Sequence, residues 1–225
     1  YYFEKTARID LISPDKESVI HYTADGSLPD EKSPLYTTPF SINKSSIVRA
    51  RCYKKDMTPG WVVTDTFIKS TLHPAIPVKK KQKFESGQYY KYYLISSQNL
   101  PDYTSLKPSK EGTVGRFNLD IAPQDDYYAF EFTSLIKIPQ DGIYTFGILS
   151  DDGSRLIIDN TTVATLDFGH PPIERTGKIG LKKGYHHFRL QYYESCGGEY
   201  LNVNWSGPGI KKGFIPASAF YLPPK

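Results

Sequence analysis

Apolar and polar residues alternate along almost the whole chain, and this pattern constrains the fold more than any other feature of the sequence. One example is I-V-R-A-R-C-Y, residues 47–53, whose apolar residues alternate with Arg49 and Arg51. Another is Y-A-F-E-F, residues 128–132. Because successive side chains point to opposite faces of a β-strand, the alternation predicts half-buried strands. Clusters of Gly, Pro, Asp and Ser separate these runs, so the sequence predicts an all-β protein.

The composition agrees with strands and excludes several functional classes. The 225 residues include 18 Tyr, 12 Phe, 17 Gly and 17 Pro, a balance that favours strands and turns over helices. The formal net charge is only +4 and no basic stripe is visible, so we expect no nucleic-acid partner. We also expect no membrane span, because no segment approaches the roughly 18 apolar residues that a span requires. Two cysteines, Cys52 and Cys196, do not suffice for a disulfide framework or a zinc site.

The alternation stops between residues 71 and 83, where Pro74 and Pro77 precede four lysines. Proline and lysine together predict a semi-extended linker, with the lysines forming a solvated charge run. The alternative is that these lysines form a patch for an anionic glycan or a nucleic acid. We therefore predict a small immunoglobulin- or fibronectin-like β-sandwich at 1–70, a linker at 71–83 and a larger antiparallel β-sandwich at 84–225. The predicted inward-facing residues of the larger sandwich are Phe130, Phe132, Tyr144, Phe146, Leu156, Ile158, Phe188, Leu190, Val203 and Trp205.

Residues 20–30, I-H-Y-T-A-D-G-S-L-P-D, and the S-P-L-Y that follows at 33–36 carry a first family resemblance. Asp25 and Gly26 predict a hairpin turn between two strands. The segment from about residue 5 to 70 resembles the C-terminal immunoglobulin-like module of chitobiases and β-hexosaminidases. That resemblance implies a structural role for these residues and a neighbouring glycoside hydrolase domain.

Three blocks in the second half carry another resemblance, over about residues 84–222. They are I-P-Q-D-G-I-Y-T-F-G-I-L-S-D-D-G-S-R-L-I-I-D at 138–159, G-K-I-G-L-K-K-G-Y-H-H-F-R-L-Q-Y-Y-E at 177–194 and L-N-V-N-W-S-G-P-G at 201–209. Together they resemble the PA-14 domain, the β-sandwich named after protective antigen. The resemblance implies the predicted fold class: all-β, with a small sandwich followed by a larger PA-14 sandwich.

Asp151 and Asp152 are the candidate ligand-binding and metal-binding residues. In the sugar-binding members of the PA-14 family, the yeast adhesins, the equivalent aspartates are joined by a cis peptide bond and hold a calcium ion that bridges sugar hydroxyls. The resemblance therefore implies calcium as the cofactor, since Ca²⁺ prefers carboxylate oxygens. The alternative is that both aspartates cap the turn into the next strand by accepting backbone N–H groups. Further candidate oxygen donors are Asp167, Glu199, Asn202 and Asn204.

The sequence also bears on the roles of Trp61 and His170. Trp61 follows Pro59 and Gly60, and an exposed indole there is a candidate for stacking on a sugar ring. His170 lies in D-F-G-H without metal-ligand partners at a defined spacing, so we interpret it as a loop-stabilising histidine.

The sequence predicts no catalytic residues. Strand patterns fill the chain and leave no room for the roughly 250 residues of a barrel that carries a glycosidase carboxylate pair. The chain begins at Tyr1 without Met, which we interpret as a piece of a longer protein. The resemblances imply a non-catalytic accessory region of a secreted or periplasmic bacterial glycoside hydrolase, with a β-N-acetylhexosaminidase as the favoured parent. Its expected partners are glycans and the catalytic domain of the same polypeptide. The alternatives are a stand-alone calcium-dependent adhesin fragment at the cell surface and a purely structural spacer.

Overall fold

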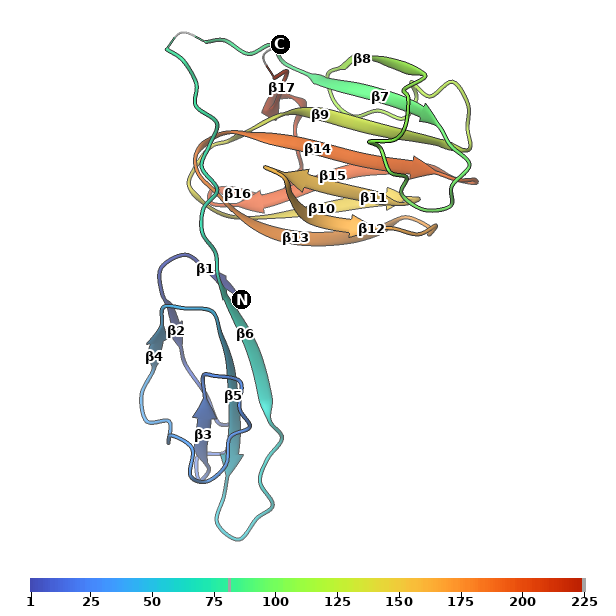
Figure 1. Cartoon of the computed structure of the whole chain (residues 1–225). Helices are drawn as coiled ribbons and strands as arrows, with labels where there is room; N and C mark the ends of the chain where they lie inside the picture. Colours follow the sequence, from blue (N-terminus) through green and yellow to red (C-terminus); the bar gives the residue numbers. More distant parts are fainter. Residues whose placement is uncertain (81, 224–225) are drawn as a thin grey trace. The chain divides into compact units, whose positions relative to one another are not determined.

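A computed structural model describes residues 1–80 and 82–223 of the chain. It forms two compact units, Tyr1–Thr71 and Leu72–Lys225 (Figure 1). The prediction of an all-β protein is confirmed, because the described residues form strands and, at Ala217–Ala219, one turn of 3₁₀ helix. In the same residues, no helix has the length and apolarity needed to cross a membrane. Lys81 of the predicted linker and residues 224 and 225 of the predicted second domain lie outside the described residues.

The first unit consists of short strands around a small core. Its main sheet has the order β1-β6-β5-β3, in which β1 pairs with β6 in parallel and the other pairs are antiparallel, while β2 pairs with β4. The strands are β1 (Tyr2–Phe3), β2 (Ala7–Ile9), β3 (Val19–Thr23), β4 (Phe40–Ile42), β5 (Ser46–Tyr53) and β6 (Val63–Lys69). Phe3, Ile9, Ile42 and Val48 form the core of this unit, so the strand alternation does place apolar side chains inward.

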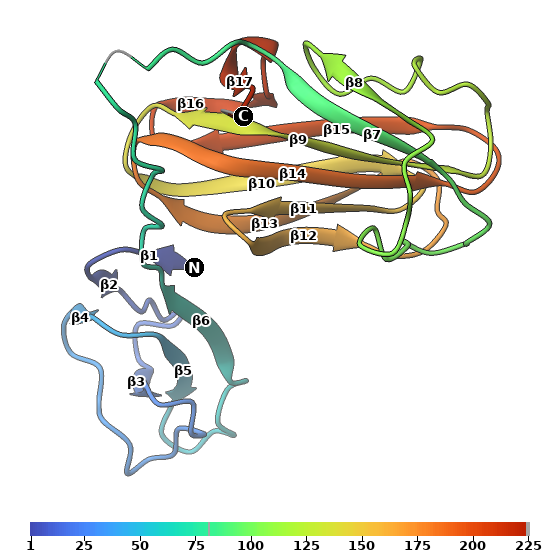
Figure 2. The same ribbon diagram turned by 45° about the horizontal axis from the view of Figure 1, so that its top comes forward.

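The second unit is a sandwich of two antiparallel sheets (Figure 2). The sheet that we call the β10 sheet has the order β13-β10-β15-β16, with β13 (Ile173–Leu181), β10 (Gly142–Asp151), β15 (Tyr200–Gly207) and β16 (Ile210–Phe214). The β14 sheet has the order β12-β11-β14-β9-β7-β8, with β17 also paired to β9. Its strands are β7 (Gln88–Leu94), β8 (Lys110–Val114), β9 (Tyr128–Ile138), β11 (Ser154–Ile158), β12 (Thr161–Leu166), β14 (Gly184–Glu194) and β17 (Phe220–Tyr221).

The core of the second unit lies between these two sheets. All ten predicted inward-facing residues are buried in one cluster, which confirms the alternation. The rings of Phe130 and Phe132 stack with centroids 5.1 Å apart, so the aromatic excess of the sequence fills this interior. A smaller cluster on the other face of the β14 sheet joins Tyr93, Ala129 and Tyr193 to Tyr103 from the segment between β7 and β8. Both faces of the β14 sheet are therefore covered at this end.

Residues 72–76 of the predicted linker pack on the second unit. The N–H of His73 donates to the carbonyl of Gly180 at 2.8 Å, and the N–H of Ile76 donates to the carbonyl of Tyr185 at 2.9 Å. Pro74 removes a donor only at its own position, so the neighbouring amides still pair with the sandwich. The sequence predicts a semi-extended spacer here, whereas this part is held by backbone hydrogen bonds.

Candidate functional site: an acidic cluster at the strand ends

The chain crosses from one sheet to the other at residues 151–154, and this crossing positions the candidate site. Asp151 is the last residue of β10, and Ser154 begins β11 in the β14 sheet. A side chain at Gly153 would place its Cβ 2.2 Å from the ring of Tyr193, so only glycine fits this close approach. The neighbouring strand of β11, β14, ends at Glu194. Strand ends from opposing sheets therefore meet at one place.

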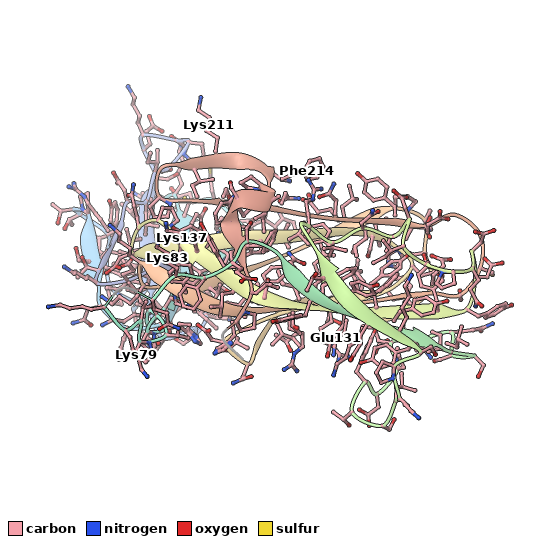
Figure 3. All side chains as sticks on the ribbon, turned by 90° about the horizontal axis from the view of Figure 1, so that it is seen from above. Lys79, Lys83, Glu131, Lys137, Lys211 and Phe214 are labelled. Carbon is pink, nitrogen blue, oxygen red and sulfur yellow. The ribbon has the colours of Figure 1, made fainter. Side chains whose placement is uncertain are left out.

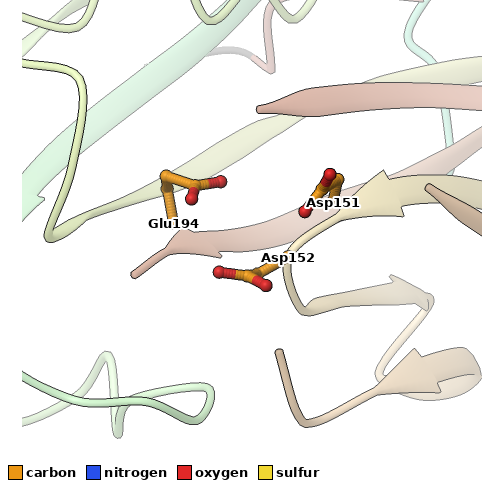
Figure 4. Close-up of side chains that lie close together, drawn as sticks. All are labelled: Asp151, Asp152 and Glu194. Atoms are coloured by element: carbon orange, nitrogen blue, oxygen red, sulfur yellow. The ribbon is translucent and has the colours of Figure 1, made fainter. Parts of the chain in front are cut away.

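Three carboxylates gather there, with oxygens of Asp151, Asp152 and Glu194 all within 4.8 Å of one another (Figure 4). The peptide bond between Asp151 and Asp152 is cis, the arrangement that the family resemblance implies. Asp152 is 5% exposed and Glu194 is fully buried, while Asp151 is half-buried. Grouped carboxylates of this kind repel one another unless protons, hydrogen bonds or a cation compensate.

Asp152 ties two loops together through its carboxylate. Its Oδ1 accepts the backbone N–H of His170 at 2.9 Å. Its Oδ2 accepts both the N–H of Ser195 at 3.0 Å and the Ser195 hydroxyl at 2.7 Å. The donors come from the loop before β13 and from the turn after β14. Asp152 thus has the capping type of contact that the sequence offered as an alternative, although it caps distant loops instead of its own turn.

Glu194 is the most deeply buried carboxylate of the cluster. Its Oε2 lies 2.7 Å from the Tyr192 hydroxyl, which also lies 2.5 Å from the carbonyl oxygen of Asp151. One hydroxyl hydrogen serves one acceptor at a time, and Glu194 Oε1 is buried with no hydrogen-bond partner among the described residues. Burial, together with the charges of Asp152 and Asp151, raises the pKa of Glu194 to about 7.

The pKa of Asp151 is raised as well, chiefly by burial and then by the charge of Asp152. His170 opposes this shift, and the charge of Glu199 adds to it. Two of the three carboxylates in the cluster are therefore harder to ionise than isolated carboxylates. A cation bound at the cluster would stabilise the ionised form of these carboxylates.

The other oxygen donors suggested by the sequence are engaged elsewhere or exposed; they are Asp167, Glu199, Asn202 and Asn204. Asp167 Oδ1 accepts the N–H of Leu100 at 2.7 Å. Asn202 Oδ1 accepts a guanidinium N–H of Arg116 at 2.7 Å. The third member of the cluster is instead Glu194, which the sequence analysis missed. The available signal was a carboxylate that directly follows the aromatic end of a predicted strand, in Q-Y-Y-E at residues 191–194.

Trp61 belongs to the first unit, between β5 and β6, and its side chain is 93% exposed. The turn before it is anchored, since the N–H of Gly60 donates to the carbonyl of Cys52 and Arg51 Nε donates to the carbonyl of Gly60. The indole is thus presented to solvent, and sugar stacking by it stays a prediction. His170 Nδ1 lies 2.9 Å from the carbonyl oxygen of Pro171, a contact that fits the loop-stabilising interpretation.

Each of the two units matches a model of a known protein family. A family model described as the PA14 domain matches residues 85–218, and a model described as Fn3 associated matches residues 9–67. Among curated proteins, the anti-sigma-I factor RsgI3 of Acetivibrio thermocellus is 23% identical over 137 residues, which cover 60% of this chain and 21% of that protein. The aligned part of this chain therefore spans about a fifth of that relative's length.

Solved structures with a similar fold include an anti-sigma factor domain-containing protein, which is 17% identical with a TM-score of 0.54. That alignment covers 92% of this chain and 78% of the other. A PA14 sugar-binding domain from an RTX adhesin is also 17% identical, with a TM-score of 0.51, over 62% of this chain and 99% of the adhesin domain. At these identities the similarity establishes the shared fold.

Proposed function

This chain belongs to the PA14 domain family, and from that premise we propose that it is a non-catalytic, calcium-dependent glycan-binding region. The proposed ion site consists of Asp151, Asp152 and Glu194. The fold is shared with a domain described as sugar-binding, in an RTX adhesin. The single observation that supports the site most strongly is the convergence of these three carboxylates at the ends of two sheets.

The residues present suit a hard cation. Within the part of the chain that the structure describes, Glu194 Oε1 is a buried carboxylate oxygen without a hydrogen-bond partner, and such an oxygen is costly to leave unsatisfied. Asp152 is already held by His170 and Ser195, so its position does not depend on the ion. Asp151 is the most accessible of the three and faces the same cluster. When bound, Ca²⁺ would supply coordination positions for the hydroxyl groups of a sugar.

We also propose what kind of longer protein contains this region. The resemblance of the first unit to a chitobiase module supports a secreted or periplasmic glycoside hydrolase, in particular a β-N-acetylhexosaminidase. A second candidate is the glycan-sensing part of an anti-sigma factor, which is favoured by an alignment that spans both units in one such protein. The sequences that flank the region in its gene distinguish the two, since one predicts a catalytic barrel and the other a sigma-factor-binding segment.

A glycan array probed with the full chain tests the binding function. We expect binding in millimolar calcium, loss of binding in EDTA, and loss in Asp151→Asn. Asp120→Asn is the matched control, because it removes the same charge at an exposed position of the same unit. Binding that persists in EDTA and in Asp151→Asn would refute the calcium site. An absence of any glycan binding would instead favour the spacer alternative.

A further inference from the structure

A row of polar residues crosses the outer face of the β14 sheet. Lys91 of β7, Glu131 of β9, Gln191 of β14 and Arg155 of β11 are direct cross-strand partners, one after the next. Direct partners point to the same face of a sheet. Phe130 and its alternate neighbours face the core, so this row faces outward (Figure 3, where Glu131 is labelled).

A cavity of about 540 Å³ lies over this row, and we call it the outer-face cavity. The segment between β7 and β8 forms its wall. Tyr103 anchors that segment, because its hydroxyl donates to the carbonyl of Tyr192 at 2.7 Å and its ring meets Tyr93 edge-on at 5.5 Å. The hydroxyl of Tyr193 fixes the same segment by donating to the carbonyl of Gln98 at 2.6 Å. The wall is therefore held in place before any ligand arrives.

Gln191 lines the cavity with an unsatisfied acceptor. Its side chain is 6% exposed, and its Nε2 donates to Glu131 Oε2 at 2.9 Å. Its Oε1 is buried and has no hydrogen-bond partner in residues 1–80 and 82–223. Because a buried amide oxygen is normally paired, the site calls for a ligand that donates an O–H or N–H group.

Two guanidinium groups line the same cavity and make only long ion pairs. Arg189 Nε lies 3.8 Å from Glu131 Oε2, and an Arg155 terminal nitrogen lies 4.0 Å from Asp167 Oδ2. Both separations exceed hydrogen-bond distance, so the guanidinium forks remain able to take acceptors from a ligand. A planar fork of this kind matches a carboxylate particularly well.

The charged side chains that line the cavity are three cations, Lys91, Arg155 and Arg189, and two carboxylates, Glu131 and Asp102. Glu131 accepts from Gln191, and Asp102 Oδ1 accepts both the N–H and the hydroxyl of Thr104 within its own turn. Two further carboxylates lie beside the lining, Asp167 near Arg155 and Glu111 across the sheet from Lys91. The preference for an anionic ligand therefore depends on the two guanidinium forks and not on the net charge around the cavity.

We propose that the outer-face cavity binds a carboxylate-bearing sugar, with the carboxylate against Arg155 and Arg189 and a hydroxyl donated to Gln191 Oε1. A neutral sugar would donate a hydroxyl to Gln191 Oε1 but would leave the guanidinium groups of Arg155 and Arg189 without a carboxylate. A simple carboxylate would pair with the guanidinium groups but would leave Gln191 Oε1 without a donor. The site needs no metal ion, and none of the residues of the acidic cluster lines it. It is therefore a second ligand site, whose existence does not depend on calcium binding by the cluster.

The test is a calorimetric titration of the full chain, in EDTA, with glucuronate and galacturonate, and with glucose, galactose and acetate as comparison ligands. We expect a uronate to bind at least tenfold more tightly than its neutral counterpart and than acetate. Arg155→Gln combined with Arg189→Gln should weaken uronate binding at least tenfold. Lys211→Gln, an exposed lysine on β16, is the matched control for lost positive charge and should leave binding unchanged.

Chemical-shift changes of backbone amides place the site independently of the variants. Uronate should shift amides of β7, β9, β11 and β14 together with the segment between β7 and β8. Equal binding of uronate and neutral sugar, equal binding of acetate, or an equal loss in Lys211→Gln would each overturn the proposal. Because calcium is absent throughout, uronate binding would be observed even if the acidic cluster held no ion.

Discussion

Asp152 combines two tasks in one side chain. Its carboxylate accepts three hydrogen bonds from His170 and Ser195, and it also stands within the acidic cluster. The sequence presented these roles as alternatives because a D-D-G segment is typical of both a turn and an ion site. In the folded chain the hydrogen bonds fix the loops, and the fixed loops hold the carboxylate beside Asp151 and Glu194.

Replacing Asp152 with alanine should lower the free energy of unfolding by about 1 to 3 kcal/mol, because the buried amide of His170 and the half-buried amide of Ser195 lose their acceptor. Chemical denaturation in EDTA measures this loss without any contribution from calcium. Asp120→Ala is the control and should change stability by less than about 0.5 kcal/mol, since Asp120 is exposed. A similarly small effect of Asp152→Ala would show that these hydrogen bonds are not made.

Glu194 predicts a pH dependence of stability in the calcium-free chain. Its pKa is raised to about 7 in the folded state, so the folded chain binds the proton more tightly than the unfolded chain. This contribution to stability is complete below the usual glutamate pKa of about 4.5 and is lost as the pH rises through about 7.

In EDTA the melting temperature of Glu194→Gln should therefore vary less with pH than that of the unchanged chain between pH 4.5 and 7. Thermal melts at several pH values check this difference. Parallel pH profiles for the two chains would mean that the carboxyl group of Glu194 titrates normally.

At the scale of elements, alternation was sufficient to predict strands and the inward side chains of the core. It was insufficient for the site, because Asp151 and Glu194 lie 43 residues apart on strands of opposing sheets. The alternation of apolar and polar residues also does not reveal which outward-facing side chains are covered by another segment of the chain. Tyr93 and Tyr193 are buried only because the segment between β7 and β8 packs over them. Pro74 and Pro77 predict an extended segment and do not indicate the backbone pairing of residues 72–76.

A substitution at Gly184 tests whether residues 72–76 pack on the second unit. The φ of Gly184 is +138°, a conformation that favours glycine, and a Cβ at this position would lie 2.5 Å from the Cβ of Ala75. Gly184→Ala should therefore destabilise the chain by more than about 1 kcal/mol. Adding Ala75→Gly should recover the part of this loss that comes from the clash.

A double-mutant cycle of these two positions, measured by denaturant unfolding, separates the clash from the backbone cost. Energies that simply add would show that Ala75 does not pack against Gly184. A positive coupling would support the contact and, with it, the placement of residues 72–76 on the sandwich.

At the scale of the whole molecule, the chain consists of two compact units with separate cores. The candidate ion cluster and the outer-face cavity both belong to the second unit, whereas Trp61 belongs to the first. Composition and motif spacing predict two β-rich parts joined near residue 71. They could not reveal the cavity, because cross-strand register brings its residues together.

Limited proteolysis with trypsin should cut first near the start of the second unit, after Lys79, Lys80 or Lys83. These lysines are exposed, whereas the backbone of His73 and Ile76 is hydrogen-bonded to the sandwich. Mass spectrometry of the early fragments identifies the first site. An initial cut elsewhere, for example after Lys54, would show that residues 77–83 are protected.

A calorimetric titration of calcium into the full chain, with Asp151→Asn as the comparison, tests the proposed calcium site. We expect saturable binding heat that is lost in the variant. We also expect a higher melting temperature of the unchanged chain in calcium, equivalent to roughly 2.7 kcal/mol when calcium is a hundredfold above its Kd. No binding heat and an unchanged melting curve in millimolar calcium would contradict the claim that Asp151, Asp152 and Glu194 form a calcium site.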